Sequence, residues 1–224
     1  MTARILSLDT TSEHGSIALL ESGCVVEEVP LHSPEGFGHV LFDSVATLLA
    51  RHGWSLRDVE CFAACAGPGS FTGVRVGLAA VKGLAESTHR RVAAVSTLQA
   101  LAWFGTASVR APVLDARRGE VYAAMYDERL EPLTAETVGP LARWLDSLPG
   151  TPAPEFLAQD RALLADALAG GRFAGAVVTL APRALAGAVG GIANRLAIAG
   201  RTLDPADVDA SYVRRSDAEL FRAG

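Results

Sequence analysis

The same local pattern opens both halves of this chain, and the repetition limits the folds that the sequence can adopt. An alternating apolar run over residues 3–8 ends at Asp9, a polar turn follows, and an apolar strand resumes at 16–20. The second copy runs from residues 111–114 through Asp115 and a short turn into an alternating stretch. A repeated start of this kind indicates a duplication in which each half is a β-sheet with helices on its faces.

Helical and strand patterns fill the rest of each half. Residues 59–66 form a short continuous apolar run, which is typical of a strand covered on both faces. Apolar residues at helical spacing predict an amphipathic helix before this strand, and a glycine-bearing helix follows it. The expected strands lie at 3–8, 16–20, 25–30, 59–66, 92–95, 111–114 and 120–126, and the expected helices at 38–51, 72–86, 97–104, 160–168 and 182–199. We therefore expect an α/β protein with lobes of residues 1–105 and 106–224.

Composition excludes several classes of protein. Half of the 224 residues are apolar, so a core can form without metal or disulfide support, and the three cysteines best fit a reducing compartment. No charged start followed by an apolar stretch and no run of about 18 apolar residues occurs. The net charge is −5, and the arginines are scattered in pairs. We expect a cytoplasmic protein that neither crosses a membrane nor binds nucleic acid tightly by itself.

The segment AGPGSFTGVRVG at residues 66–77 is glycine-rich where a helix begins. Each glycine inside a helix costs about 1 kcal/mol relative to alanine, so another interaction must compensate. A phosphate cradle using Gly67 and Gly69 is one explanation, but the spacing matches no phosphate-binding motif and Pro68 removes a donor. Close packing is the favoured explanation, because Gly73 and Gly77 share one helix face. The packing partner can be this chain itself, or, as the sharper hypothesis, another protein.

The two aspartate-tipped turns carry a nucleotide hypothesis. Asp9, Thr10 and Thr11, with Asp115 as their counterpart, resemble the paired turns that hold Mg²⁺ and phosphates in actin-like ATPases and sugar kinases. Bulky cations occupy the second turn, at Arg117 and the residue after it, where small hydroxylated residues would be expected. The alternative, that each aspartate caps its own turn, is favoured.

Other catalytic or metal sites find little support in the sequence. The five histidines never occur four residues apart on one predicted helix, which argues against a metal site. Ser70 does not stand in a G-x-S-x-G motif and is better explained as the cap of the helix that follows. The small-residue segment GGIAN at residues 190–194 favours helix packing over an adenosine-binding turn.

Five blocks of sequence occur in order over almost the whole chain and resemble the bacterial TsaB family, whose members take part in making threonylcarbamoyladenosine in tRNA. These blocks are ILSLDTTSEHGSIALL (5–20), AGPGSFTGVRVG (66–77), VSTLQALA (95–102), LDARRGEVYAAMY (114–126) and SYVRR (211–215). The combination of GPGSFTG with the later DARRGEVY is the most specific part of the match. Residues 131–175 carry no block of the family.

The resemblance implies a two-lobed actin-like ATPase fold (ASKHA, ribonuclease H-like) with a reduced second lobe. It also implies kinship with TsaD, the subunit that carries the transferase chemistry. This sequence lacks the paired-histidine metal motif of TsaD. The resemblance therefore predicts no catalytic residue and no metal site in this chain. ATP and Mg²⁺ are expected only at the level of a complex.

The same resemblance predicts the partners. A TsaD-like transferase subunit is expected to bind two helices of the first lobe, and the chain is expected to form a homodimer through that surface when the transferase is absent. A TsaE-like ATPase is a further partner, and tRNA is expected to be reached only through the complex. The interface predicted in this way consists of His39, Phe42, Val45, Ala46, Leu49, Gly73, Arg75, Val76, Gly77 and Ala80.

Three functions can be weighed on these grounds. The first is a non-catalytic partner subunit of the TsaD-like transferase. The second is an actin-like kinase-type enzyme that binds ATP through Asp9 and Asp115. The third is a glycoprotease-like peptidase, which no Ser-His-Asp spacing, Cys-His pair or zinc motif supports.

Overall fold

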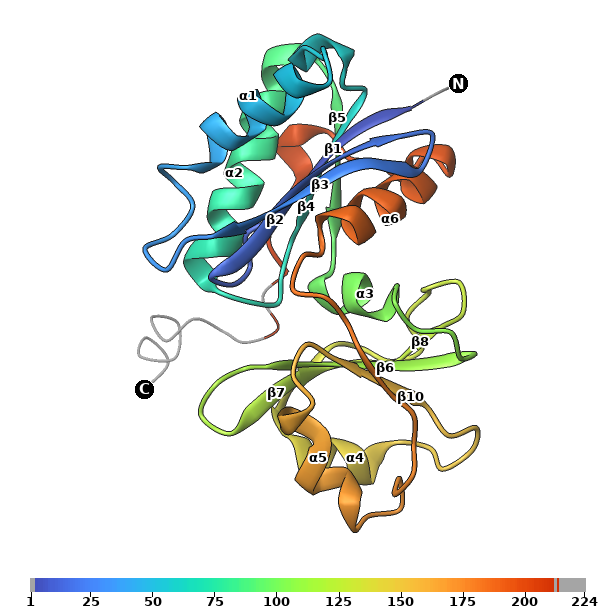
Figure 1. Ribbon diagram of the computed structural model, residues 1–224. Coiled ribbons are helices and arrows are strands. Elements are labelled where there is room, and N and C mark those ends of the chain that lie inside the picture. Colours follow the sequence, from blue (N-terminus) through green and yellow to red (C-terminus); the bar gives the residue numbers. More distant parts are fainter. Residues whose placement is uncertain (1–2, 212, 214–224) are drawn as a thin grey trace, which may run out of the picture. The chain divides into compact units, whose positions relative to one another are not determined.

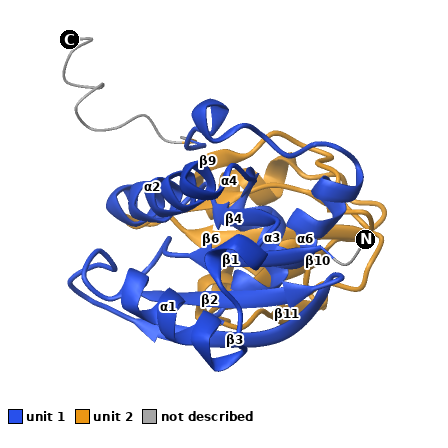
Figure 2. Cartoon of the chain, turned by 90° about the horizontal axis from the view of Figure 1, so that it is seen from above, with its two compact units in different colours: residues 1–100, 183–211 blue, residues 101–182, 212–224 orange. Residues whose placement is uncertain are grey.

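The chain divides into two compact units, coloured separately in Figure 2. The structure is a computed structural model that describes residues 3–211 and 213. Unit 1 takes in the described residues up to 100 together with residues 183–211, and unit 2 takes in residues 101–182. Most of the SYVRR block therefore lies outside the described residues. Each unit has its own sheet and its own apolar core.

Unit 1 is built on a five-stranded mixed sheet. Its strand order is β3 (Cys24–His32), β2 (His14–Glu21), β1 (Arg4–Asp9), β4 (Cys61–Cys65) and β5 (Arg91–Val95). The first three strands, all expected from the sequence, form an antiparallel meander. β4 and β5 continue the sheet in parallel. The unbroken apolar sequence of β4 agrees with a strand that is covered on both faces. Side chains of β1, β2 and β4 thus lie in the middle of the sheet, where they are almost fully buried.

Helices cover both faces of this sheet. Figure 1 shows α1 (Leu41–Arg51) and α2 (Phe71–Thr88) on one face and α6 (Ala186–Ile198) on the other. α1 begins three residues later than the sequence pattern indicated, because the residues from Gly38 to Val40 form a turn. The short helix α3 (Thr97–Ala102) follows β5, and the 3₁₀ turns η1 (Leu56–Asp58) and η2 (Pro205–Asp207) complete the unit.

α6 corrects the expected lobe boundary, which placed all residues after 105 in the second lobe. The Ser16 hydroxyl of β2 accepts hydrogen bonds from the backbone N–H groups of Leu185 (3.0 Å) and Ala186 (2.8 Å). Gly190 faces the sheet, and a Cβ there would lie 2.1 Å from the Leu20 side chain. The small residues of the GGIAN segment therefore serve helix packing, as the sequence favoured. Because strands of the first sheet cap and bury α6, residues 183–211 belong to unit 1.

Unit 2 contains a second mixed sheet with helices packed on one face. Its strand order is β11 (Val178–Leu180), β10 (Glu155–Ala158), β6 (Val109–Asp115), β7 (Glu120–Ala123) and β9 (Thr137–Pro140), with β8 (Tyr126–Asp127) also paired to β6. The single strand expected at 120–126 is split into β7 and β8, and between them the Met125 N–H donates to Thr134 Oγ1. The helices α4 (Leu141–Ser147) and α5 (Ala162–Ala169) contribute Trp144 and Leu164 to the core.

Candidate functional site

The predicted partner interface lies on α1 and α2, and the structure divides its residues into two groups. His39, Phe42, Ala46 and Arg75 are exposed, whereas Val45, Leu49, Gly77 and Ala80 are buried in the core of unit 1, and Gly73 and Val76 are half-buried. An amphipathic helix must bury one stripe to stay on its sheet, and the buried group forms that stripe. The exposed group alone can meet a partner in this conformation.

Gly73 and Gly77 do not face outward, which corrects the interpretation of α2 as a glycine-lined docking face. A Cβ on Gly73 would lie 1.9 Å from the backbone oxygen of Thr10, and one on Gly77 would lie 2.5 Å from Thr10 Oγ1. The Thr10 hydroxyl donates a 2.7 Å hydrogen bond to the Gly73 carbonyl. We call Gly73, Gly77 and Ala80 the inner face of α2. Its glycines let the turn between β1 and β2 approach the helix within the same molecule.

Another side of α2 holds an exposed row of residues that the predicted interface included only through Arg75. Thr72, Arg75, Ala79 and Gly83 are exposed and follow one another at three- or four-residue spacing, and we call them the outer face of α2. A Cβ on Gly83 would meet no atom within 4 Å. The three- or four-residue spacing of the outer face is visible in the sequence. The sequence alone does not say which of the two faces of α2 packs against the sheet.

Two exposed aromatic side chains accompany the outer face. Phe42 on α1 is 55% exposed, and Phe71 at the start of α2 is 43% exposed. The Arg75 guanidinium lies 3.7 Å from the centre of the Phe71 ring, in a cation–π arrangement. Ala46, one turn after Phe42, is also exposed. Aromatic and arginine side chains beside small residues are the composition expected of protein-binding surfaces.

The polar groups of the first aspartate turn bind one another. Asp9 is buried, and its Oδ1 accepts hydrogen bonds from Thr11 N (2.9 Å) and Thr11 Oγ1 (2.7 Å). Burial raises the pKa of Asp9 above its usual value, and the bonds from Thr11 offset part of this rise. The Thr10 hydroxyl donates its hydrogen bond to the Gly73 carbonyl of α2. Asp9 therefore caps its own turn, as the favoured interpretation held.

The glycine-rich loop before α2 is also filled by this chain. A Cβ on Gly69 would lie 2.7 Å from Thr11, and one on Gly67 would lie 2.8 Å from the Ser211 backbone oxygen. The Ser70 N–H, which a phosphate cradle would use, donates to the Thr11 carbonyl at 2.7 Å. The Ser70 hydroxyl accepts from Gly73 N and caps the helix, as predicted. These contacts use the space and the donors that a phosphate would need.

The second aspartate turn carries cations in strained backbone positions. Asp115 is exposed, and its Oδ1 accepts a 2.7 Å hydrogen bond from Arg117 N. The Arg117 guanidinium lies 3.7 Å from Asp115 Oδ2. Arg117 and Arg118 have φ angles of 64° and 57°, in the left-handed region that favours glycine. The residues of the two aspartate turns thus do not fit the Mg²⁺–phosphate site of an actin-like ATPase.

No group resembling a peptidase centre stands out in the part of the chain that the structure describes. Burial raises the pKa of the Cys61 thiol to about 11 and that of Cys65 well above its usual value, so neither thiol is poised as a nucleophile. Among the described residues, no group of three or more histidine, cysteine or carboxylate side chains is arranged to hold a metal ion. In the same residues, no helix combines the length and the apolar character needed to cross a lipid bilayer.

Comparison with known proteins gives two independent matches in sequence. The family model for TsaD, described as tRNA N6-adenosine threonylcarbamoyltransferase, matches residues 29–186. A protein from Bacillus subtilis (strain 168) named tRNA threonylcarbamoyladenosine biosynthesis protein TsaB is 31% identical over 228 residues, covering 96% of each chain.

Comparison of structures agrees with these matches. YeaZ from Pseudomonas aeruginosa superposes with a TM-score of 0.80 over 94% of this chain and 99% of that chain, at 26% identity. The activator of the 2-hydroxyisocaproyl-CoA dehydratase from Clostridium difficile, solved with bound ADPNP, has a TM-score of 0.53 over 88% of this chain and 97% of that chain. Its identity of 10% supports a likeness in fold alone. The predicted actin-like ATPase fold is confirmed.

Proposed function

Because the chain belongs to the TsaB family of tRNA threonylcarbamoyladenosine biosynthesis proteins, we propose that it is a non-catalytic subunit that binds a TsaD-like transferase. The observations that carry this proposal are the exposed outer face of α2 and the exposed side chains of Phe42, Ala46 and Phe71 on the two helices. This surface would hold the transferase subunit in the geometry that its chemistry requires, and the chain would add no reacting group of its own.

The composition of this surface suits a close helical contact. Gly83 has open space around its Cβ position, and Ala79 lies one turn before it, so a partner helix could approach the α2 backbone. Phe42 and Phe71 supply the large apolar area that anchors most protein interfaces. A specific complex of this kind usually buries about 800 Å² on each partner.

The two aspartate turns support the proposal that the chain has no catalytic role. The hydroxyl groups and backbone donors of the first aspartate turn are engaged within the chain, and arginines occupy the second. We propose that ATP and Mg²⁺ act elsewhere in the complex, through the transferase subunit and a TsaE-like ATPase. We also propose that tRNA is reached through the complex, and that two copies of this chain pair through the outer face of α2 when the transferase is absent.

Reconstitution tests the proposal directly. The full chain, the TsaD-like subunit and the mixture would each be supplied with tRNA and the threonylcarbamoyl donor, and modified adenosine would be measured. We expect none from this chain alone, together with a stable complex of the two proteins on gel filtration. Modification of tRNA by the chain alone would overturn the non-catalytic role, and failure of the two proteins to associate would overturn the partner role.

A further inference from the structure

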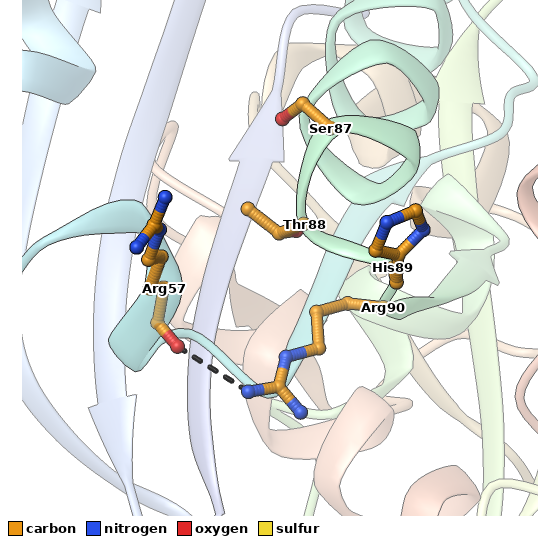
Figure 3. A pocket seen from close by; sticks show the side chains of 5 residues that line it. All are labelled: Arg57, Ser87, Thr88, His89 and Arg90. Atoms are coloured by element: carbon orange, nitrogen blue, oxygen red, sulfur yellow. Dashed lines mark hydrogen bonds between the residues drawn. The ribbon is translucent and has the colours of Figure 1, made fainter.

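A cavity of about 370 Å³ lies at the C-terminal end of α2, at the opposite end of the helix from the first aspartate turn. Three basic side chains line it: Arg57 from η1, and His89 and Arg90 from the turn after α2. Ser87 and Thr88 complete the lining. Figure 3 shows these five side chains around the end of the helix. A chain with a net charge of −5 thus gathers three basic groups at one hollow in its surface.

Capping of the helix does not account for these basic groups. Cations at a helix C-terminus commonly bind its last carbonyl oxygens. Here the Leu84 oxygen already accepts from the hydroxyls of Ser87 and Thr88, both at 2.8 Å. The Ala85 oxygen accepts from Arg90 N at 2.9 Å, and the Glu86 oxygen accepts from His89 N at 3.3 Å. These three carbonyls therefore have partners without the three basic side chains.

The guanidinium of Arg90 is only partly satisfied. Its Nη2 donates a long 3.3 Å bond to the Arg57 carbonyl, drawn as the dashed line in Figure 3. Its Nε is buried and has no hydrogen-bond partner. A buried donor without an acceptor is costly, and native proteins keep few of them. The described residues thus leave one donor of Arg90 without an acceptor.

No carboxylate neutralises the cavity in the described part of the chain. Neither Arg57, His89 nor Arg90 takes part in an ion pair there. The adjacent Asp58 is engaged with its own turn, where its Oδ2 accepts from Ser55 N (2.7 Å) and Ser55 Oγ (2.8 Å). The positive charge of the two arginines is therefore available to an incoming anion.

His89 adds evidence from backbone strain. Its φ is 53°, in the left-handed position that closes a helix and that glycine usually occupies. A histidine at such a site costs stability that glycine would spare. Strained residues that persist in a structure often mark functional sites. At this position the histidine places an imidazole at the edge of the cavity.

We propose that this cavity binds a phosphate group. Guanidinium groups match the oxygens of phosphate in charge and geometry, and Arg57 and Arg90 place two of them at this cavity. The volume lies at the lower end of the range for small-molecule pockets, which suits a phosphate with part of the molecule that carries it. A nucleotide and an RNA backbone both offer this chemistry.

Titration of the full-length isolated chain with inorganic pyrophosphate tests the proposal. Binding would be followed by calorimetry and by the imidazole proton resonances of His89. We expect saturable binding that Arg57→Gln weakens at least tenfold. Arg57 is exposed, so this variant should keep its fold, which circular dichroism would check. Arg143→Gln, which removes the same charge from an exposed position on α4, should bind as the wild type does.

Absence of saturable binding to the wild type, or equal weakening by Arg57→Gln and Arg143→Gln, would overturn the proposal. Arg90→Lys gives a second test, because it keeps the charge and removes the Nε donor. We expect weaker binding from this variant if it folds. Competition then identifies the source of the phosphate: displacement of pyrophosphate by ADP indicates a nucleotide, and displacement by a tRNA transcript at constant salt indicates an RNA backbone.

Discussion

The inner and the outer face of α2 both carry glycine and alanine, but only the inner face packs against the rest of the chain. On the inner face, Gly73 and Gly77 lie against Thr10 of the same molecule, and a Cβ on either would collide with it. On the outer face, Gly83 and Ala79 are exposed, and a Cβ on Gly83 would meet nothing. A glycine in a helix therefore indicates close packing without saying against what. The neighbour of the missing Cβ decides whether the packing is internal or available to a partner.

Gly73→Ala should have the largest effect on stability. The new Cβ would lie 1.9 Å from a backbone oxygen, so either the β1–β2 turn or the helix must move. We expect a loss of about 3 kcal/mol in the free energy of unfolding, at the upper end for overpacking. Denaturant titration would measure it. A loss below about 0.5 kcal/mol would show that the inner face is loosely packed and would remove the contrast between the faces.

Asp9→Asn should stabilise the protein at neutral pH, because the buried Asp9 carboxylate is costly to ionise. Burial raises the pKa of Asp9 in the folded protein. Between the unfolded and the folded pKa the folded state binds more protons, so Asp9 lowers stability progressively as pH rises through this window. Asparagine keeps an oxygen for the two bonds from Thr11. We expect the variant to melt at a higher temperature at pH 7 and at an equal temperature below the unfolded pKa.

A melting-temperature difference between Asp9→Asn and the wild type that stays constant from neutral to acidic pH would mean that ionisation of Asp9 does not set the difference. Ser12→Asn, an exposed change in the same turn, serves as the control and should show no such pH dependence.

Thr10→Val should have a smaller effect. The substitution keeps the shape of the side chain and removes the hydroxyl that donates to the Gly73 carbonyl at 2.7 Å. We expect a loss of about 1 kcal/mol, typical of one buried hydrogen bond. Thr72→Val, on the exposed outer face, is the matched control and should change stability by less than about 0.5 kcal/mol. Equal effects from the two valine substitutions would contradict the distinction between the faces.

Gly83→Ala should change stability by no more than Thr10→Val does, and with the opposite sign to Gly73→Ala. Alanine is favoured over glycine inside a helix by about 1 kcal/mol, and no atom of this chain obstructs the new methyl group. Thermal unfolding should show a gain of roughly 2 °C for a chain of this length. Destabilisation by Gly83→Ala would mean that the outer face is covered within the free protein.

Sequence reasoning predicted most of the elements because their signals are local. Alternation identified β1 and β2, and the unbroken apolar run identified β4 as a covered strand. The tertiary position of α6 could not be predicted, because its caps come from Ser16, a residue about 170 positions away in the chain. Local patterns carry no record of such long-range contacts.

The candidate site was predicted only in part for the same reason. Both aspartate turns cap themselves as expected, since an aspartate two residues before a backbone N–H is a local arrangement. The inner and outer faces of α2 were confused, because glycines at 73, 77 and 83 look alike until the sheet fixes the direction of packing. The cavity at Arg57 and Arg90 was missed entirely, because its walls come from elements 33 residues apart.

Binding of Gly83→Leu to a TsaD-like subunit tests the central claim most directly. A Cβ at this exposed position meets no atom of the free chain within 4 Å, so the fold should be kept. At a tight interface the leucine should raise the dissociation constant at least tenfold, which is a loss of about 1.4 kcal/mol in binding free energy. Ala142→Leu, at an exposed position on α4, should bind as the wild type does. If a folded Gly83→Leu protein bound the transferase subunit with unchanged affinity, the outer face of α2 would not be the interface.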